Sequence, residues 1–339
     1  MVATSEGWGE ALLLADGRLA GGQEMSHRAR CLRDYAWVLG LLCMGFLALA
    51  FAQGAGRWTT GAPMPSERSE VAVAEVGGRV YVVGGFAGQT ELEIYDPTAD
   101  RWSRGAAVPR ALHHAAAVGV DGKLFVVGGY VDGWTAADAV YEYDPATDRW
   151  RTRAPMPTPR GALAAAASDG KIYAVGGVGR DKRNTAAHEV YDPATDRWTA
   201  LAPVPTPRDH LAAAVLGGQF YAIGGRVDGR FSDNLAVNEA FDPTANRWQT
   251  RKPLPTARSG IGAAVLDGKI FVFGGEAPSG TFNQVEAYEP QTDTWRTYAP
   301  MPTARHGLGV AAVGGRIYVI AGGPTPGGSA SSRNEVFTP

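Results

Sequence analysis

Short runs of alternating apolar and polar residues recur along most of the chain, and a pair of glycines follows each run. In residues 79–83, for example, apolar and β-branched side chains recur with the period of two expected of a β-strand. The glycine pairs are Gly84/Gly85, Gly128/Gly129, Gly176/Gly177, Gly224/Gly225, Gly274/Gly275 and Gly322/Gly323. No long segment after residue 57 shows helical periodicity. The pattern therefore predicts an all-β domain.

A second run, rich in Ala and Val, precedes each alternating run, and two turn residues separate the two runs. The turn pairs are Gly77-Gly78, Asp121-Gly122, Asp169-Gly170, Gly217-Gly218, Asp267-Gly268 and Gly314-Gly315. A type I′ turn requires positive φ at both central positions, so these pairs predict two-residue hairpins. The small side chains of runs such as residues 164–167 suit a strand that lies close to a narrow axis.

Tryptophans place both runs in one repeating register. A tryptophan stands 26 or 27 residues before each glycine pair, and successive tryptophans are 44 to 50 residues apart. They are Trp58, Trp102, Trp150, Trp198, Trp248 and Trp295. Each repeat also ends in an aromatic residue, usually within Tyr-Asp-Pro: Tyr95, Tyr143, Tyr191, Phe241, Tyr288 and Phe337. A period of this length indicates a propeller or another repeat architecture.

This combination of motifs resembles the Kelch repeat over residues 57–339. Six copies imply an all-β, six-bladed Kelch β-propeller with four antiparallel strands in each blade, as in the superfamily of the galactose oxidase central domain. Trp58 lacks a preceding Tyr-Asp-Pro, and Phe337 lacks a following tryptophan. We therefore expect the N-terminal strand to complete the last blade, which would remove two open sheet edges.

The segment before the repeats has the composition of an export signal. Three arginines precede an apolar stretch over residues 36–50, and an A-x-A cleavage site ends at Ala52. We interpret residues 1–24 as an over-long extension before a start at Met25, residues 25–52 as a signal peptide and residues 53–339 as the propeller. The protein is then secreted or periplasmic. The alternative is an uncleaved anchor over residues 35–52, which would hold the propeller at the membrane and outside the cytoplasm.

Charge and cysteine content exclude several functions. The formal net charge of −2 at pH 7 offers no electrostatic case for nucleic acid, and a membrane partner is expected only if the leader is uncleaved. Both cysteines, Cys31 and Cys43, precede the repeats. The cysteine-dependent copper-radical site of galactose-oxidase-like enzymes therefore cannot form in the propeller. Phosphate-loop, H-E-x-x-H and G-x-S-x-G motifs are absent. We expect a monomer without a cofactor.

Loop lengths indicate which face carries a ligand. From the second glycine of each pair to the aromatic, the spacing is 10, 14, 14, 16, 13 and 14 residues, whereas the other connections hardly vary. These variable segments join the second and third strands. They share a face with the links that enter each inner strand. Binding sites tend to lie on such loops.

Arginines recur on the same face, ten residues after five of the tryptophans. They are Arg68, Arg160, Arg208, Arg258 and Arg305, while Leu112 holds this register in the second blade and Arg110 stands two residues earlier. Kelch proteins that bind acidic peptides use arginines at this place, so the resemblance implies a cationic rim for an anionic ligand. The alternative is that a recurring arginine serves the repeat itself, by binding carbonyl groups or an acidic side chain.

Residues that break the repeat provide a second set of candidates. After the arginine register stand Glu70, His113, His114, His210 and His306, and the variable loops add Trp134, Arg226 and Glu276. Imidazoles and carboxylates around one mouth suit general acid/base chemistry, although they also suit the lining of a solvated channel. A metal would require imidazoles of separate blades to converge, so no metal ligand is assigned. Trp134 could stack on a sugar, anchor a peptide or pack onto its own loop.

The leading interpretation is an exported binding module that presents its arginine-rimmed loop face to a protein, peptide or glycan. No catalytic residue is assigned. One alternative is a sugar-acid mutarotase or epimerase resembling the bacterial N-acetylneuraminate epimerases, with a cation from Arg68, Arg208 or Arg226 and an acid or base from Glu70, His210 or Glu276. Another alternative is a structural spacer of the cell envelope. Fold analogy alone does not choose among them.

Overall fold

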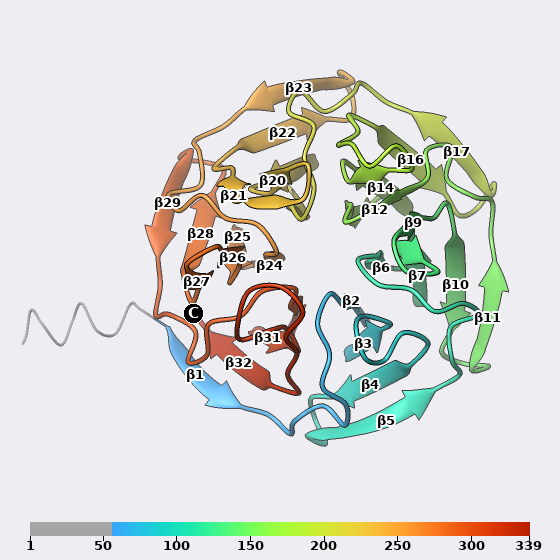
Figure 1. Ribbon diagram of the computed structural model, residues 1–339, viewed down its shortest axis with the longest axis vertical. Coiled ribbons are helices and arrows are strands. Elements are labelled where there is room, and N and C mark those ends of the chain that lie inside the picture. Colours follow the sequence, from blue (N-terminus) through green and yellow to red (C-terminus); the bar gives the residue numbers. More distant parts are fainter. Residues whose placement is uncertain (1–55) are drawn as a thin grey trace, which may run out of the picture. The chain divides into compact units, whose positions relative to one another are not determined.

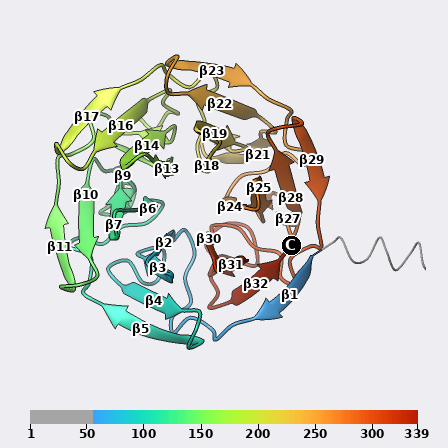
Figure 2. The ribbon, with the colours of Figure 1, turned by 180° about the vertical axis from the view of Figure 1, so that it is seen from behind.

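The computed structural model describes residues 56–339 of the 339-residue chain, so the predicted extension and signal peptide lie outside the described residues. Six four-stranded antiparallel sheets surround a central axis as the blades of a propeller (Figure 1; Figure 2). This arrangement confirms the predicted all-β, six-bladed architecture. Within residues 56–339, no helix is long and apolar enough to span a bilayer.

Each blade runs outward from a short inner strand beside the axis. Blade 1 contains β2 (Ala72–Val76), β3 (Arg79–Val83), β4 (Leu92–Asp96) and β5 (Arg101–Gly105). Blade 2 contains β6 (Ala116–Val120), β7 (Lys123–Val127), β10 (Val140–Asp144) and β11 (Arg149–Thr152). Blade 3 contains β13 (Ala164–Ser168), β14 (Lys171–Val175), β16 (His188–Asp192) and β17 (Arg197–Ala200).

The remaining blades follow the same order. Blade 4 contains β18 (Ala212–Leu216), β19 (Gln219–Ile223), β22 (Asn238–Asp242) and β23 (Arg247–Thr250). Blade 5 contains β24 (Gly262–Leu266), β25 (Lys269–Phe273), β28 (Val285–Glu289) and β29 (Thr294–Thr297). Blade 6 contains β30 (Gly309–Val313), β31 (Arg316–Ile320), β32 (Asn334–Thr338) and β1 (Arg57–Thr60).

Inner strands and turns have the predicted conformations. The first two strands of blade 1 are joined at Gly77 and Gly78, whose φ angles are 59° and 78°. Asp121 and Gly122 turn the blade 2 hairpin with φ angles of 48° and 72°. These are the left-handed values that a type I′ turn requires, so the turn residues determine the register of both strands.

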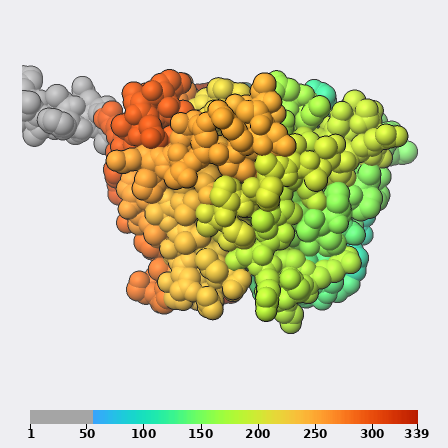
Figure 3. All heavy atoms as spheres, turned by 90° about the horizontal axis from the view of Figure 1, so that it is seen from above, coloured from blue at the N-terminus to red at the C-terminus, as the bar shows by residue number. Residues whose placement is uncertain are grey.

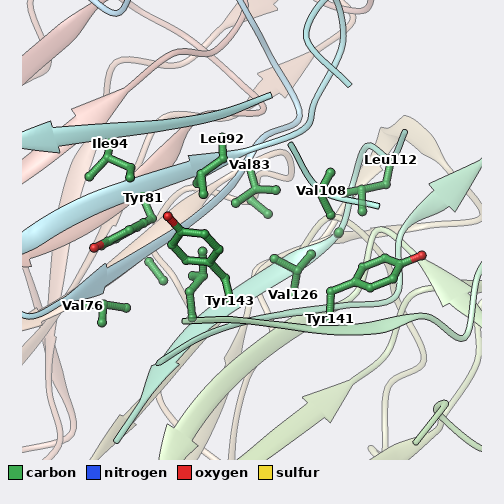
Figure 4. Close-up of a cluster of buried hydrophobic side chains, with 14 of the residues drawn as sticks. Val76, Tyr81, Val83, Leu92, Ile94, Val108, Leu112, Val126, Tyr141 and Tyr143 are labelled. Carbon is green, nitrogen blue, oxygen red and sulfur yellow. The ribbon is translucent and has the colours of Figure 1, made fainter. Parts of the chain in front are cut away.

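The hydrophobic core lies between blades. In Figure 4, Tyr81, Val83 and Leu92 of blade 1 meet Val126 and Tyr143 of blade 2 in one buried cluster. The repeat tryptophans lie farther out and are half-buried. Each donates its indole N–H to the link that leads into its blade, as Trp150 does to the carbonyl of Ala106 at 2.7 Å. The repeat thus couples neighbouring blades by apolar contact and by a regular hydrogen bond.

Additional two-stranded hairpins occupy several of the variable loops. They are β8 (Tyr130–Val131) with β9 (Thr135–Ala136), β20 (Arg226–Val227) with β21 (Arg230–Asn234), and β26 (Glu276–Ala277) with β27 (Gly280–Thr281). In blade 3, β12 (Arg160–Gly161) pairs with β15 (Val178–Gly179). Figure 3 shows the ring from its side, with short projections along the lower edge. The hairpins hold the first residues of each loop close to the axis.

The N-terminal strand closes the ring, as predicted. β1 pairs antiparallel with β32, and Trp58 lies opposite Phe337. The two rings are 5.0 Å apart, and the Trp58 indole donates to the carbonyl of Ala299 at 3.0 Å. Residues at opposite ends of the repeat region therefore form one sheet, and blade 6 is complete only with both.

Deleting residues 57–64 should lower the melting temperature and broaden the unfolding transition. The deletion removes β1, exposes the edge of β32 and leaves Phe337 without Trp58. Thermal unfolding followed by circular dichroism measures the effect. An unchanged, cooperative transition would show that the ring does not depend on this closure.

Candidate functional site

A closed circle of backbone hydrogen bonds surrounds the axis on the loop face. One residue per blade contributes, two positions before the inner strand: Glu70, His114, Ala162, His210, Gly260 and Gly307. Each N–H donates to the carbonyl of its counterpart in the preceding blade, over 2.7 to 3.0 Å. All six have left-handed φ angles, between 51° and 65°. The circle therefore places one residue from each of the six blades at the same mouth of the channel.

Left-handed backbone is unfavourable for a side chain with a Cβ, by about 1–2 kcal/mol per residue. Glycine adopts it readily at Gly260 and Gly307, but Glu70, His114 and His210 hold it against this cost. Strained conformations of this kind cluster at binding and catalytic sites. Ala162 bears the same strain, so three of the four strained residues in the circle carry titratable side chains.

The five repeated arginines do not reach the mouth. They are fully buried, and each forms an ion pair with a glutamate on the third strand of its own blade: Arg68–Glu93, Arg160–Glu189, Arg208–Glu239, Arg258–Glu286 and Arg305–Glu335. Arg208 is typical, with 2.6 Å to Glu239 and further bonds to the carbonyls of Gly224 and Ala222. The guanidinium groups link strands inside the blade and present no cationic rim to solvent.

Blade 2 shows that the arginine and the glutamate act as a unit. Where the other blades have arginine it has Leu112, and where they have glutamate it has Tyr141. Both residues are buried in the same apolar cluster. A buried ion pair can be exchanged for packed apolar groups at little cost, whereas the loss of one partner leaves an uncompensated charge. Arg110, nearby in sequence, instead forms an exposed ion pair with Asp132.

At the mouth itself, Asp209, His210, Arg226 and Glu276 form a hydrogen-bonded chain. The carboxylate of Asp209 contacts Nδ1 of His210, and Nη2 of Arg226 lies 2.8 Å from Nε2 of that histidine. Arg226 also donates to Glu276 at 2.6 Å and lies 3.3 Å from Asp209. The chain spans blades 4 and 5. Since Asp209 holds Nδ1, the Nε2 atom of His210 is the one directed at the guanidinium group.

On the other side of the mouth, Glu70 lies between two histidines. Its carboxylate is 3.4 Å from Nε2 of His114 and 3.6 Å from Nε2 of His306. His114 contacts His113 through their Nδ1 atoms at 2.6 Å, and Nε2 of His113 meets the carbonyl of Gly133 at 2.7 Å. Four titratable side chains from blades 1, 2 and 6 thus meet at one point.

Burial and these contacts shift several pKa values. Burial holds the pKa of His114 well below its ordinary value, and it also lowers that of His113. Burial disfavours the charged form of Asp209, but the hydrogen bond from His210 and the electrostatic attraction of that imidazole lower the pKa of Asp209 to about 2. Burial likewise opposes ionisation of Glu276, yet His306 and the Gly327 N–H lower its pKa. Neutral imidazoles beside ionised carboxylates can accept protons or ligate cations.

A cavity of about 360 Å³ opens beside the mouth, between the loops of blades 2, 3 and 4. Its lining is Tyr130, Trp134, Val178, Gly179, Lys182, His210, Arg226, Asp228 and Gly229. Trp134 is 61% exposed, although its ring also contacts Tyr130 and His113, with centroids 5.1 Å and 4.9 Å away. His210 lines this cavity and also a smaller one, of about 100 Å³, at the channel mouth. The two spaces therefore adjoin at His210.

The structure brings eight of the predicted site residues together at the mouth: Glu70, His113, His114, Trp134, His210, Arg226, Glu276 and His306. It places Arg110 on an exposed loop and the five repeated arginines inside the blades. Asp209, Lys182 and Asp228 were not predicted. The position of Asp209 directly before His210 was an available signal, but Lys182 and Asp228 stand in variable loops without a motif.

Replacing Arg208 with Leu should lower the free energy of unfolding by about 3–5 kcal/mol, because Glu239 is left charged and buried. The double variant Arg208→Leu/Glu239→Tyr copies blade 2 and should recover much of that loss. Arg230→Met removes an exposed ion pair in the same blade and should cost less than about 1 kcal/mol. Urea unfolding measures all three. Equal losses in the single and double variants would contradict the coupling.

Lowering the pH from 7 to 5 should destabilise the protein. His188 is buried between blades 3 and 4, and burial lowers its pKa to about 4. The unfolded chain then binds more protons than the folded one, so this stability is complete above about pH 6.5 and falls as the pH drops toward 4. The expected loss at pH 5 is about 2 kcal/mol. In blade 4 the equivalent position is Asn238, so His188→Asn is a conservative replacement and should reduce the loss of stability measured by urea unfolding. An unchanged loss would contradict the assignment to His188.

Comparison with known proteins agrees with this architecture. The profile of the KLHDC2/KLHL20/DRC7 Kelch-repeats domain matches residues 95–250 and 179–337, and the Kelch motif matches residues 67–109. A solved structure titled "Structure of YjhT" is similar in fold, with a TM-score of 0.74 and 18% sequence identity over 83% of this chain and 97% of that chain. No curated protein sequence matched. The chain therefore belongs to the Kelch-repeat family of β-propellers.

Proposed function

We propose that this Kelch propeller is an exported binding module that holds a small, hydroxyl-rich glycan ligand in the cavity beside the channel mouth. The observation that carries the proposal is the exposed ring of Trp134, which lines a cavity of about 360 Å³ together with Lys182 and Asp228. Export rests on the signal peptide predicted over residues 25–52.

The chemistry of the cavity suits a sugar. An exposed aromatic ring such as that of Trp134 stacks against the apolar C–H face of a sugar ring, and the buried Tyr130 packs against Trp134. Lys182, Asp228 and His210 provide donors and acceptors for hydroxyl groups at the same cavity. Pockets of a few hundred Å³ with an apolar wall and a few convergent polar groups are typical of small-ligand sites. A sugar unit would find both kinds of contact here.

Charge and size separate a glycan from the other partners considered. Three carboxylates lie at the mouth, those of Asp209, Glu70 and Glu276, and the guanidinium group of Arg226 pairs with Asp209 and Glu276. This balance disfavours a strongly acidic peptide. A stable protein partner would cover about 800 Å² of this surface, whereas the feature that distinguishes this face is a confined cavity. A neutral or weakly charged glycan is the ligand that fits both the charge at the mouth and the size of the cavity.

A sugar mutarotase or epimerase is the second candidate, because Asp209, His210 and Arg226 stand at the junction of the cavity and the mouth. Asp209 orients the His210 imidazole, which could take up or return a proton, and Arg226 could bind a carboxylate of the sugar. Of the three cations considered for that role, Arg208 and Arg68 are buried within their blades. Arg226 is therefore the one that faces the cavity.

Trp134→Ala should weaken glycan binding by roughly tenfold or more, which corresponds to the loss of a central aromatic contact. A glycan array identifies ligands, and isothermal titration then compares variants. Arg230→Met, on an exposed loop of blade 4, is the matched control and should bind normally. Binding unaffected by Trp134→Ala, or capture of proteins alone, would contradict the proposal.

The enzyme candidate needs a separate measurement. NMR exchange spectroscopy on each bound sugar would detect faster interconversion of its anomers. Catalysis predicts exchange that His210→Gln abolishes while binding persists. A pure binding module predicts no acceleration by the unmodified protein.

A further inference from the structure

Two histidines at the channel mouth direct unprotonated nitrogens toward the same space. The carbonyl of Gly133 can only accept, so Nε2 of His113 carries a proton and donates to it. With His113 neutral, its Nδ1 accepts a hydrogen bond from Nδ1 of His114, which lies 2.6 Å away. His114 is then protonated on Nδ1, and its unprotonated Nε2 atom has a lone pair that can bind a metal ion.

His210 reaches the same state through a different partner. Its Nδ1 atom contacts the carboxylate of Asp209, which accepts the proton of that nitrogen. The remaining Nε2 atom is therefore unprotonated, and its lone pair accepts a hydrogen bond from Nη2 of Arg226 at 2.8 Å. An imidazole whose other nitrogen donates to a carboxylate or to a further hydrogen-bonding group is the usual form of a metal-bound histidine, because the second partner fixes the tautomer and the ring orientation.

Glu70 completes the set. Its Oε2 atom lies 3.4 Å from Nε2 of His114, longer than the distance of about 2.8 Å at which a charge-assisted hydrogen bond forms. One ligand atom each from Glu70, His114 and His210 lies within 4.8 Å of the others. Tetrahedral Zn²⁺, with bonds of about 2.0–2.1 Å, needs ligand atoms about 3.4 Å apart. The Glu70–His114 pair already has this spacing, and His210 lies within 4.8 Å of both ligand atoms, so it must approach by no more than about 1.4 Å.

We propose that Glu70, His114 and His210 form a binding site for a divalent transition-metal ion, with Zn²⁺ as the best match, at the mouth of the channel. Two imidazoles and one carboxylate are a common ligand set for Zn²⁺, with a fourth position left open. All three residues line the space of about 100 Å³ at the mouth. The site is distinct from the aromatic wall of the glycan cavity and does not depend on the proposed function.

The surrounding charges favour a cation. Asp209, Glu70 and Glu276 bring three negative charges, and Arg226 brings one positive charge. His306 faces carbonyl oxygens with both ring nitrogens, Gly323 at 3.1 Å and Gly327 at 2.9 Å. The three carboxylates at the mouth therefore outnumber its one guanidinium group, that of Arg226.

A second group, formed by Glu70, Glu276 and His306, is also compact. Its atoms are already engaged, however. Both nitrogens of His306 serve the two carbonyls, and Glu276 accepts from Arg226 at 2.6 Å and from the Gly327 N–H at 3.0 Å. These contacts leave no lone pair on His306 for a metal. In this group, His306 instead lies 3.6 Å from Oε1 of Glu70, whereas His114 lies beside the other carboxylate oxygen, Oε2.

Arg226 is the one neighbour that must move. Its Nη2 atom lies 2.8 Å from Nε2 of His210, where it occupies the lone pair that the metal would use. The guanidinium group is planar and rigid, so Nη2 leaves His210 only if the whole group shifts, and the contacts to Glu276 at 2.6 Å and to Asp209 at 3.3 Å then lengthen as well. Metal uptake therefore exchanges one hydrogen bond of His210 for a coordinate bond and weakens the ion pairs of Arg226.

The test is Zn²⁺ binding to the purified, chelator-treated protein, measured by isothermal titration and by metal analysis after dialysis. We expect one Zn²⁺ per chain. His114→Gln and His210→Gln should each weaken binding by roughly 100-fold or more, and Asp209→Asn by about 10- to 100-fold through misorientation of His210. His306→Gln should change affinity by less than about tenfold, and the remote His188→Asn should have no effect.

Cobalt provides a second readout that does not depend on stability. Bound Co²⁺ should give visible absorption bands that change in His114→Gln while thermal unfolding remains cooperative. The proposal is overturned if Zn²⁺ binds no more tightly than to the His114→Gln/His210→Gln double variant. It is also overturned if His306→Gln causes the larger loss, because the second group would then be the ligand set.

Discussion

The closed circle of six backbone hydrogen bonds at the channel mouth is the constraint on which the site depends. It joins the first blade to the last, and it holds one residue of every blade in the left-handed conformation. Side chains that are distant in sequence, such as Glu70 and His306, therefore meet at 3.6 Å. A single β-sheet could not bring together residues from six repeats, whereas a ring does so at its axis.

Residues that recur in the repeats and residues that differ between them have different roles in this ring. The arginine–glutamate pairs recur in five blades and are buried within them, so they belong to the blade. The mouth is asymmetric. At Gly307 an added Cβ would lie 2.4 Å from Oε1 of Glu70, and at Gly260 it would lie 3.3 Å from Cβ of His306. Gly307 thus provides the space that the side chain of Glu70 occupies, and Gly260 leaves room for His306.

Two positions in each blade supply nearly all of the mouth. One is the residue in the hydrogen-bonded circle, and the other follows the glycine pair. Short bridges join the residue just before the circle residue to the residue after the glycine pair, as between Asp209 and Arg226 or between His113 and Tyr130. The glycine pair permits this contact, because a Cβ at Gly225 would lie 2.8 Å from the carbonyl of Asp209. The same geometry positions the acid–base chain, the aromatic wall and the proposed metal ligands.

The sequence by itself determined the six repeats, the hairpin turns, the closure by the N-terminal strand and the face on which unusual residues gather, because these follow from local periodicity and from turn chemistry. It also identified most residues of the mouth, since histidines and carboxylates interrupted a regular register. Only the tertiary structure decided that the repeated arginines are paired inside the blades and that Asp209 orients His210. The physical reason is that charge pairing and imidazole tautomers depend on distances between strands and blades, which no local pattern contains.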